Sequence, residues 1–431
     1  MADSYKDLSI PIIARVEGEG ALHLKIHNGQ INQLELSIYE PPRLFEKFLE
    51  GRSANEVIDA VARICGICPV AYQMSAVQAI EHIFEMPVTP WVHEMRRLFY
   101  CGEWIESHGL HIHMLAAPDF LRYPSVIAMA KDHPEVVKRG MHLHGLGLKL
   151  MSLLGKRSVH PVGACVGGFY AAPKITEVKT VLAQFKQSLP LAEELVAWSA
   201  SLPLAKVKQD FTSVSLRHKH EYPMNEGRIV SDKGLNIDIS EFDHHLKESQ
   251  VAYSTALQCH LHGKPYLVGP MARLNLNYDL LPKAIQDILA HCKINFPSQN
   301  MFHSVIARAV EIYYAMLEAI RIMESYAYTA TPCIPMTPRA GVGFGCTEAP
   351  RGLLWHRYEF NEEGLVTSSR IVPPTSQNQA RIEEDLRHAL MQYGLDHSDD
   401  DLRFHSEMVI RNYDPCISCS THFLTLKVQR S

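Results

Sequence analysis

The sequence predicts a mainly helical α+β fold, with a central bundle of long helices, an N-terminal antiparallel sheet and inserted hairpins. Three observations support this prediction: apolar and polar residues alternate near the N-terminus, helical periodicity prevails afterwards, and two short alternating stretches interrupt it. The chain shows neither a repeat of fixed period nor a low-complexity linker. We therefore expect residues 1–431 to form one domain, in which residues 1–40 are the β-rich part.

The N-terminal sheet is predicted from a hairpin pattern. Apolar side chains alternate with polar ones over residues 22–26 and again over residues 34–38, and Asn28-Gly29 lies between the two runs. An Asn-Gly pair between two such runs is the strongest short signal for a β-hairpin, because both residues tolerate positive φ. We therefore expect two antiparallel strands joined at Asn28-Gly29.

Helical periodicity then predicts the bundle and its insertions. The strongest helical segments are residues 70–84, a long helix that begins at Thr89 and Pro90, residues 176–200 and residues 303–326. The last of these carries apolar residues nearly all round, as a helix buried inside a bundle does. Two further hairpins are expected at residues 227–240, around Lys233-Gly234, and at residues 357–372, around Glu363-Gly364.

Composition restricts the class of protein. The chain has 431 residues, of which 46% are hydrophobic and 21% charged, as in an ordinary globular protein. Its net charge of −5 gives no reason to expect nucleic acid as a partner. No apolar run reaches the ~18–20 residues that a membrane span needs, and the first residues lack the apolar core of a signal peptide. We therefore expect a cytoplasmic protein without a membrane span.

The ten cysteines fall into two groups. Six occur singly in mostly apolar surroundings and are expected to be buried, reduced thiols: Cys101, Cys165, Cys259, Cys292, Cys333 and Cys346. The other four form two Cys-x-x-Cys pairs, Cys65 with Cys68 and Cys416 with Cys419. Cys-x-x-Cys lets two sulfurs converge on one centre, and four thiolates suit zinc, iron or nickel.

A zinc ribbon and a thioredoxin-like redox pair are the alternatives for these four cysteines. Zinc ribbons place their two pairs about 15–20 residues apart, whereas almost the whole chain separates Cys68 from Cys416. A thioredoxin-like pair needs a βαβ context, which neither motif has. We therefore expect one metal site assembled from both ends of the chain, and the spacing alone leaves the metal open.

The motifs around the cysteines identify the metal through a resemblance. RICGIC near the start and DPCISCSTH near the end resemble the paired cysteine motifs of nickel–iron hydrogenase large subunits, and the likeness extends over essentially the whole chain. The resemblance implies that family's fold. The further segments that match are Arg15–Gly18, Phe45-Glu46 with Gly51-Arg52, Glu348–Gly352 and Pro373–Thr375.

This resemblance implies reversible, heterolytic cleavage of dihydrogen at a nickel–iron centre. Cys65 and Cys416 would be terminal nickel ligands. Cys68 and Cys419 would bridge nickel to an iron that also carries carbon monoxide and two cyanide ligands. The catalytic base would be a terminal cysteine sulfur, such as that of Cys416, or the guanidinium of Arg351. We favour the thiolate, because arginine stays protonated in proteins.

The same resemblance assigns roles to residues around the metals. Glu17 would carry the proton away from the terminal cysteine. Backbone and side-chain groups would surround the diatomic ligands on iron, since such neighbours orient and tune metal-bound groups. The residues of this group are Pro350, Arg351, Pro374 and Thr375. Glu46 and His422 would hold a structural magnesium, whose octahedral site takes oxygen and imidazole ligands.

Three departures from the family pattern point to a soluble, cytoplasmic type that exchanges electrons with NAD(P) or a deazaflavin. Tyr72 stands where many members have histidine, Ser107 where membrane-bound types have an acidic residue, and Glu19 where the N-terminal motif has histidine. The sequence around Cys65 is most similar to the NADP-linked sulfhydrogenase type, so sulfur or polysulfide is another possible acceptor.

The remaining cofactors are expected in partner subunits. This chain has neither a G-x-G-x-x-G after a strand nor an iron–sulfur cysteine run. The resemblance implies an iron–sulfur small subunit, together with diaphorase-type flavin and ferredoxin-like subunits. Residues 423–431 resemble an extension that a maturation endopeptidase removes, which predicts cleavage between His422 and Phe423.

Four alternative functions stay open at this point. The chain could be a deazaflavin-linked hydrogenase or a hydrogen sensor with the same centre. It could also be a non-catalytic relative, such as the quinone-site subunit of the respiratory NADH dehydrogenase, although that subunit lacks the four cysteines. The last alternative is a structural subunit stabilised by zinc.

Overall fold

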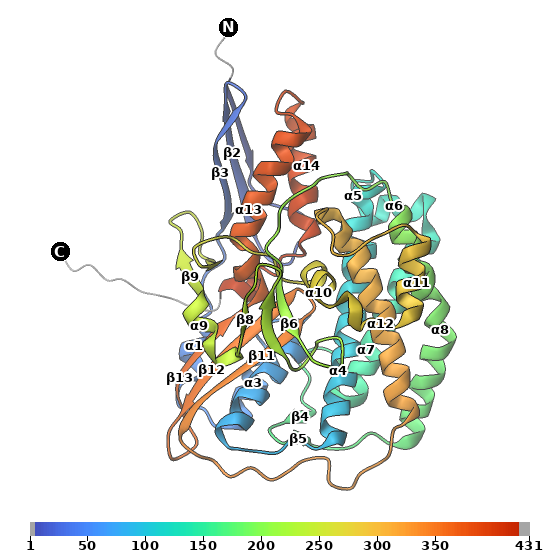
Figure 1. The fold of residues 1–431 in the computed structure, drawn as a ribbon, viewed down its shortest axis with the longest axis vertical. Coiled ribbons are helices and arrows are strands. Elements are labelled where there is room, and N and C mark those ends of the chain that lie inside the picture. Colours follow the sequence, from blue (N-terminus) through green and yellow to red (C-terminus); the bar gives the residue numbers. More distant parts are fainter. Residues whose placement is uncertain (1–4, 422–431) are drawn as a thin grey trace, which may run out of the picture.

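A computed structural model describes residues 5–421 of the chain (Figure 1). It confirms the predicted fold class, since long helices dominate and the strands form small antiparallel sheets. His422 and the extension 423–431 lie outside the described residues. Within residues 5–421, no helix is long and apolar enough to cross a lipid bilayer.

Four long helices form the bundle: α4 (Pro90–Leu110), α7 (Pro134–Gly155), α8 (Ile175–Ser201) and α12 (Ser304–Glu324). Helix α4 packs against both α7 and α12, and α12 also packs against α8 (Figure 1). The hydroxyl oxygen of Thr89 accepts a hydrogen bond from Val92 N at 3.2 Å, so the predicted start of α4 is confirmed. The segments predicted at 176–200 and 303–326 are α8 and α12.

Glycine determines how closely α4 and α7 approach each other. A Cβ atom on Gly147 of α7 would lie 2.5 Å from the backbone nitrogen of Glu106 on α4, so a larger residue would push the helices apart.

Helix α4 continues as a π-helical segment, His111–Ala116, and then as α5 (Ala117–Phe120). Helix α7 was not predicted from the sequence, because glycine and histidine interrupt its apolar stripe.

The N-terminal sheet has the strand order β1-β2-β3. Strands β2 (Gly20–His27) and β3 (Gln30–Ile38) form the predicted hairpin. Asn28 and Gly29 have φ values of 50° and 72°, as a type I′ turn requires. Strand β1 (Tyr5–Ile10) was not predicted, and it pairs antiparallel with β2.

A second sheet, in the order β11-β12-β13, packs on α3 (Pro69–Ile83). Strands β12 (Gly352–Phe360) and β13 (Val366–Val372) are the predicted hairpin around Glu363-Gly364, and β11 (Gly341–Ala349) extends it. A Cβ on Gly345 would lie 1.9 Å from the carbonyl oxygen of Ser75, so glycine lets β11 contact α3.

Smaller elements complete the fold. The hairpin predicted at 227–240 is confirmed as part of the sheet β6 (Val214–Arg217), β7 (Arg228–Ser231) and β8 (Asn236–Ile237). The other strands are β4 (Ala164–Cys165), β5 (Gly168–Phe169), β9 (Leu246–Gln250) and β10 (Leu257–Leu261). The remaining helices are α1 (Phe45–Leu49), α2 (Ala54–Val61), α6 (Val126–Asp132), α9 (Phe242–His245), α10 (Pro270–Asn277), α11 (Lys283–His291), α13 (Pro374–Tyr393) and α14 (Asp399–Asn412).

The N-terminal sheet packs beside the two C-terminal helices. Figure 1 shows α13 and α14 beside the N-terminal sheet. The carboxylate of Glu383 on α13 accepts a hydrogen bond from Leu36 N on β3 at 2.9 Å. This packing brings residues just after β1 close to the segment that follows α14, and both cysteine pairs lie near that junction.

Three buried histidines, one in the last turn of α4 and two in the π-helical segment after it, predict a loss of stability in acid. Burial lowers the pKa of His108 to about 4 and the pKa values of His111 and His113 to about 3, against an ordinary 6.5. The folded chain therefore binds fewer protons at these sites than the unfolded chain does below pH 6.5. Stability should fall as the pH drops from 6.5 towards 4, by about 1.4 kcal/mol per pH unit for each histidine.

The test compares His111→Gln with the wild type. The Nε2 atom of His111 lies 2.8 Å from the carbonyl oxygen of Arg411, and a glutamine amide can donate the same hydrogen bond. Denaturant unfolding at several pH values should give a shallower loss of stability in acid for the variant. If the free energy of unfolding falls equally steeply with pH in the variant and the wild type, His111 is not the neutral, buried group that the structure indicates.

Candidate metal centre

The first cysteine pair lies in the turn before α3. Cys68 is the N-cap of α3, and Pro69 occupies the first helical position, where its missing N–H costs nothing. The sulfur of Cys65 accepts backbone hydrogen bonds from Ile67 at 3.4 Å and from Cys68 at 3.2 Å. These N–H groups stabilise negative charge on Cys65, because a thiolate accepts hydrogen bonds better than a thiol does.

The second pair lies in the loop after α14. The backbone N–H of Cys416 donates to Oγ1 of Thr375 at 3.0 Å. The backbone N–H of Ile417 donates to the carbonyl oxygen of Glu17 at 2.9 Å, within a parallel bridge between Glu17 and Cys416. The N-terminal segment and the start of α13 therefore hold this loop in place from two sides.

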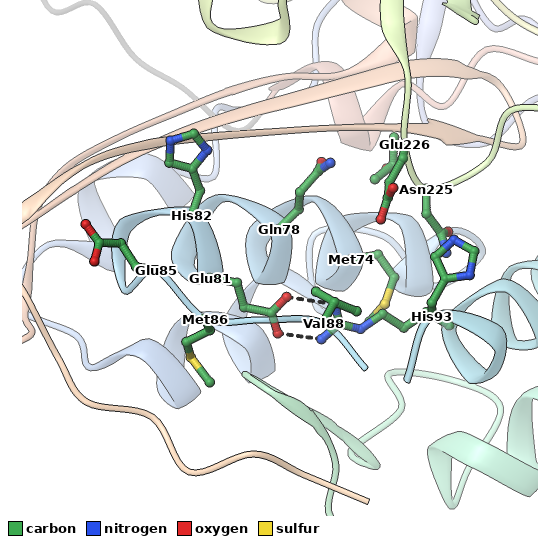
Figure 2. Close-up of a pocket in the computed structure, with 12 residues that line it drawn as sticks. Met74, Gln78, Glu81, His82, Glu85, Met86, Val88, His93, Asn225 and Glu226 are labelled. Atoms are coloured by element: carbon green, nitrogen blue, oxygen red, sulfur yellow. Dashed lines mark hydrogen bonds and ion pairs between the residues drawn. The ribbon is translucent and has the colours of Figure 1, made fainter. Parts of the chain in front are cut away.

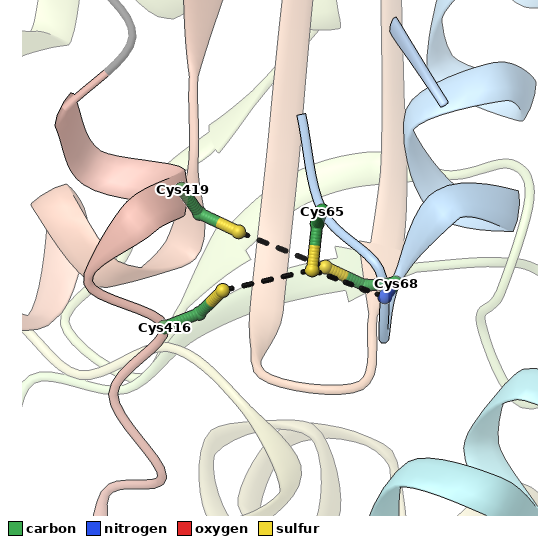
Figure 3. A group of neighbouring side chains, drawn as sticks. All are labelled: Cys65, Cys68, Cys416 and Cys419. Atoms are coloured by element: carbon green, nitrogen blue, oxygen red, sulfur yellow. Dashed lines mark hydrogen bonds between the residues drawn. The ribbon is translucent and has the colours of Figure 1, made fainter. Parts of the chain in front are cut away.

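All four cysteine sulfurs converge, as predicted (Figure 3). The sulfurs of Cys65 and Cys416 are 3.6 Å apart, and those of Cys68 and Cys419 are 3.8 Å apart. All four lie within 4.8 Å of one another, and all four residues are buried. One metal ion, or two adjacent ions, can therefore contact all of them.

The donor set fits a soft metal cation. Burial raises the pKa of Cys416, and the neighbouring cysteine sulfurs raise it further. Burial likewise raises the pKa of Cys68. A dication at this position would offset both effects, since metal coordination deprotonates a thiol outright. Four thiolates suit nickel with iron and, taken by themselves, also suit zinc.

Arg351 lies in the turn between β11 and β12, beside the second cysteine pair. Its Nε donates to the carbonyl oxygen of Asp414 at 2.8 Å, and its Nη2 to Oδ1 of Asp414 at 3.0 Å. Burial alone would lower the pKa of Arg351, but the Asp414 carboxylate and the cysteine sulfurs raise it well above its ordinary value. Its Nη1 is buried and has no hydrogen-bond partner among residues 5–421, so this donor remains for a group bound at the cysteines.

Arg273, on α10, holds the turn that carries Arg351. Its guanidinium donates to the carbonyl oxygens of Ala349 at 2.8 Å and Pro350 at 2.9 Å. It also forms fully buried ion pairs with Glu311 at 2.7 Å and Glu348 at 2.9 Å. Neither Arg273 nor Glu311 was predicted from the sequence. A glutamate inside the otherwise apolar face of α12 was the available signal for a buried partner.

Replacing Arg273 with methionine should destabilise the protein strongly. The substitution would leave the carboxylates of Glu311 and Glu348 buried without their cation, a change that costs about 3–5 kcal/mol. Denaturant unfolding of Arg273→Met measures this loss. The control is Lys186→Met, which breaks a half-exposed ion pair with Glu324 at 2.6 Å and should cost about 0–1 kcal/mol. Equal losses for the two variants would contradict the role of Arg273.

Glu17 is half-buried and lies alongside the second pair. One oxygen of its carboxylate accepts a hydrogen bond from Ser418 N at 3.1 Å, and the other accepts one from the Ser418 hydroxyl. Ser418 lies between Cys416 and Cys419 in the sequence. The structure therefore places Glu17 next to the cysteines and leaves part of it open to solvent.

Two arginines hold the segment that carries Glu17. Arg411 on α14 binds Asp119 on α5 at 2.7 Å and donates to the carbonyl oxygen of Ala14 at 3.0 Å. Arg15 also pairs with Asp119. Asp119 and Arg411 were not predicted from the sequence, because neither residue lies in a motif and their contact joins distant parts of the chain.

Glu46 is the described member of the expected magnesium site. It lies on α1, and its Oε1 accepts a hydrogen bond from Ile371 N at 2.7 Å. Burial raises its pKa to about 7. The backbone N–H of Arg43 donates to the carbonyl oxygen of Thr421 at 2.7 Å, so the last described residue approaches α1. The second expected ligand, His422, lies outside the described residues.

Tyr72 and Glu106 also face the cysteine cluster. Burial raises the pKa of Tyr72, and all four cysteine sulfurs raise it further. Its hydroxyl has no hydrogen-bond partner among residues 5–421. Burial raises the pKa of Glu106 to about 8, although the Arg351 charge opposes this effect. Tyr72 was noted from the sequence as a departure from the family pattern but was given no role, and Glu106 was not among the expected site residues.

A family model for nickel-dependent hydrogenases matches residues 43–145 and 209–422, which is more than half of the chain and includes all four cysteines. The chain belongs to the nickel-dependent hydrogenase large-subunit family. It is accordingly the large subunit of a nickel–iron hydrogenase, and the cluster of four cysteines supports a nickel centre. The predicted family and the convergence of the cysteines are both confirmed.

Curated relatives cover nearly the whole of this hydrogenase subunit. It is 31% identical to sulfhydrogenase 1 subunit alpha of Pyrococcus furiosus, over 99% of this chain and 100% of that protein. It is 32% identical to sulfhydrogenase 2 subunit alpha of the same organism, over 96% and 98% of the two chains. It is 27% identical to the beta subunit of the NAD-reducing hydrogenase HoxS of Cupriavidus necator, over 97% and 95%.

Solved structures agree with the fold. An NAD⁺-reducing [NiFe]-hydrogenase in the H₂-reduced state matches with a TM-score of 0.86 and 25% identity, over 97% of this chain and 99% of that one. A [NiFeSe] hydrogenase variant from Desulfovibrio vulgaris Hildenborough matches with a TM-score of 0.82 at 21% identity, over 98% and 100%. The second match shows the fold alone.

Proposed function

We propose that this hydrogenase subunit cleaves and forms dihydrogen reversibly and exchanges the electrons, through an iron–sulfur small subunit, with NADP(H) or NAD(H). The observation that carries the proposal is the convergence of four buried cysteine sulfurs within 4.8 Å, beside a buried Arg351 that keeps a free donor. The nickel–iron group, when bound, polarises dihydrogen for heterolytic cleavage. The residues of this chain hold that group and move the proton.

The cysteines are proposed to play two roles. All four would hold the nickel–iron group, with Cys65 and Cys416 as terminal nickel ligands and Cys68 and Cys419 shared between nickel and iron. The arrangement supports these roles, since each pair combines one cysteine from either end of the chain, at 3.6 Å and 3.8 Å. The backbone hydrogen bonds to the sulfur of Cys65 and the raised pKa of Cys416 make Cys416 the better proton acceptor of the two terminal sulfurs.

Glu17 is proposed to move the proton from Cys416 towards solvent. The hydroxyl of Ser418 binds its carboxylate and can reorient with it, while the backbone of Ile417 keeps Glu17 next to Cys416. Arg351 is proposed to stay protonated and to orient the reactant, because its carboxylate partner and the sulfurs raise its pKa.

The surroundings of iron and the magnesium site are further proposals. Pro350, Pro374 and Thr375 would surround an iron that carries carbon monoxide and two cyanides. Thr375 already accepts a hydrogen bond from Cys416 N, which supports its place at the centre. Glu46 and His422 would bind a structural magnesium, and the approach of Thr421 to α1 supports that pairing.

The partners and the acceptor are proposed from the relatives. The Pyrococcus proteins are named as alpha subunits of sulfhydrogenases, and the Cupriavidus protein as a subunit of an NAD-reducing hydrogenase. We infer an iron–sulfur small subunit and diaphorase-type flavin and ferredoxin-like subunits for this chain, acting in the cytoplasm on NAD(P). Sulfur or polysulfide is a further acceptor to test.

Removal of the tail is the last part of the proposal. Only three residues separate the second cysteine pair from residues 423–431, so cleavage after His422 by a maturation endopeptidase would fix the centre in its closed form. Intact-mass measurement of the nickel-loaded subunit should give a chain that ends at His422. A fully active, nickel-loaded subunit that retains all nine residues would overturn this part.

The test of function uses the purified multi-subunit enzyme. Metal analysis should give nickel and iron, infrared spectra should show bands of iron-bound carbon monoxide and cyanide, and hydrogen should reduce NADP or NAD. Bound zinc, without infrared bands from carbon monoxide and cyanide, would contradict the proposal and indicate a structural zinc site instead. The same bands with reduction of a deazaflavin, or with little turnover, would indicate a deazaflavin-linked hydrogenase or a hydrogen sensor.

A further inference from the structure

Two of the six cysteines that were expected to be solitary lie in contact. The sulfurs of Cys165 and Cys333 are 3.2 Å apart. Cys165 ends β4, and Cys333 lies in the segment that joins α12 to β11. The expectation of a buried thiol holds for Cys165 but is wrong for Cys333 and for Cys292, which are both half-buried. The pairing could not be predicted, because more than 160 residues separate the two positions.

Backbone hydrogen bonds fix this contact. Phe169 N donates to the carbonyl oxygen of Pro332 at 3.0 Å, and Ile334 N donates to that of Gly167 at 3.1 Å. Gly168 pairs with Cys165 on one side and with Cys333 on the other. A Cβ on Gly168 would lie 2.1 Å from the Pro332 oxygen, so glycine permits the close approach. The two cysteines are therefore held together by three adjacent backbone segments.

The thiol pair lies away from the nickel centre. Gly167, next to it, donates to the carboxylate of Glu81 at 2.7 Å. Glu81 lines a pocket of about 340 Å³ near the C-terminal end of α3 and pairs there with Arg96 (Figure 2). Cys68 caps the other end of α3, roughly 20 Å away at about 1.5 Å per helical residue. The pair is therefore chemically separate from the four metal-binding sulfurs.

The two thiols differ in access. Cys165 is only 2% exposed, whereas Cys333 is half-buried and lies in a segment of mostly exposed residues. The Cys333 sulfur also lies 3.4 Å from the carbonyl oxygen of Val166 and 3.5 Å from that of Ile334, to which its thiol can donate. Burial and the neighbouring Cys333 raise the pKa of Cys165. A dissolved reagent therefore reaches Cys333 first.

We propose that Cys333 and Cys165 form a thiol–disulfide exchange site that reacts with small, dissolved disulfides. The Cys333 thiolate attacks one sulfur of the small disulfide, forms a mixed disulfide and releases one thiol. The Cys165 sulfur then attacks Cys333, forms the internal disulfide and releases the second thiol. The protein pair loses two electrons and two protons, and the small disulfide gains them. The new bond links the segment between α12 and β11 to the β4–β5 hairpin.

The test uses oxidised glutathione and the purified, metal-loaded enzyme, in which metal protects the other four sulfurs. After incubation, free thiols are blocked with an alkylating reagent and the protein is digested with trypsin. Cleavage after lysine and arginine gives the peptides 158–174 and 322–339, each with one cysteine. We expect these two peptides to be recovered linked to each other, and to separate again after treatment with dithiothreitol.

Variants and an internal control make the result decisive. In Cys165→Ser, Cys333 should accumulate as a stable glutathione adduct, whereas in Cys333→Ser, Cys165 should stay unmodified. Cys292 is half-buried like Cys333 and serves as the solitary control: it should form an adduct but no internal link. The proposal is overturned if Cys292 reacts while peptides 158–174 and 322–339 both remain alkylated. It is also overturned if Cys165 and Cys333 form only separate adducts.

Discussion

The Cys419→Ser variant should contain neither bound nickel nor bound iron and should show no hydrogen turnover. Cys419 is proposed to bridge the two metals, and its sulfur lies 3.8 Å from that of Cys68. A serine hydroxyl at this buried position is a hard, weakly acidic donor, which does not hold soft metals as a thiolate does. Elemental analysis and hydrogen-dependent reduction of an artificial dye measure both losses in the purified enzyme.

The control for this variant is Cys259→Ser. Cys259 is as buried as Cys419 but lies in a separate apolar cluster with Trp355 and Val372. This substitution should destabilise the chain modestly and leave its metal content unchanged. Retention of both metals at normal levels in Cys419→Ser would contradict the bridging role. Metal loss in both variants would instead indicate that any buried cysteine substitution disrupts assembly.

Glu17→Gln should keep the metal centre and slow turnover by about 10²–10⁴-fold, the usual contribution of a positioned proton-transfer group. This substitution can separate proton transfer from structural effects, because Ser418 offers one N–H and one hydroxyl to the side chain. A glutamine oxygen can accept from the N–H, and its amide can donate to the hydroxyl oxygen. The variant should therefore keep the local contacts while losing the proton-carrying carboxyl group.

Hydrogen–deuterium exchange and infrared spectra measure the two effects of Glu17→Gln separately. Exchange should fall together with turnover, while the carbon monoxide and cyanide bands stay in place. Glu19→Gln is the matched control, since Glu19 is exposed two residues away and its backbone N–H donates to the Glu40 carboxylate. Unchanged hydrogen–deuterium exchange in Glu17→Gln would show that the proton leaves by a path without Glu17.

Much of the secondary structure could be predicted from the sequence, because its signals are local. Asn28-Gly29 sets the N-terminal turn through two positive φ values, and Thr89 with Pro90 starts α4. Strands β1 and β11 were missed, however. They add to hairpins only through partners that the tertiary structure supplies, and β11 also needs glycines to contact α3.

The charged groups that support the centre were not predicted. Arg273 and Asp119 lie in no motif, and each acts through contacts with carboxylates or guanidinium groups more than 35 residues away. Burying such charges is favourable only when hydrogen-bonding partners surround them, and those partners exist only in the folded chain. The contact between Cys165 and Cys333 was missed for the same reason.

The sequence by itself determined the chemistry of this protein. Cys65, Cys68, Cys416 and Cys419 are the donors that a soft metal needs, and their motifs identified a nickel–iron hydrogenase subunit. Only the tertiary structure decided how these donors are positioned. It brings the two chain ends together, binds Glu17 to Ser418 and holds the Arg351 side chain against Asp414. The reason is physical: side-chain type is a local property, whereas convergence of four sulfurs within 4.8 Å depends on the packing of elements from both ends of the chain.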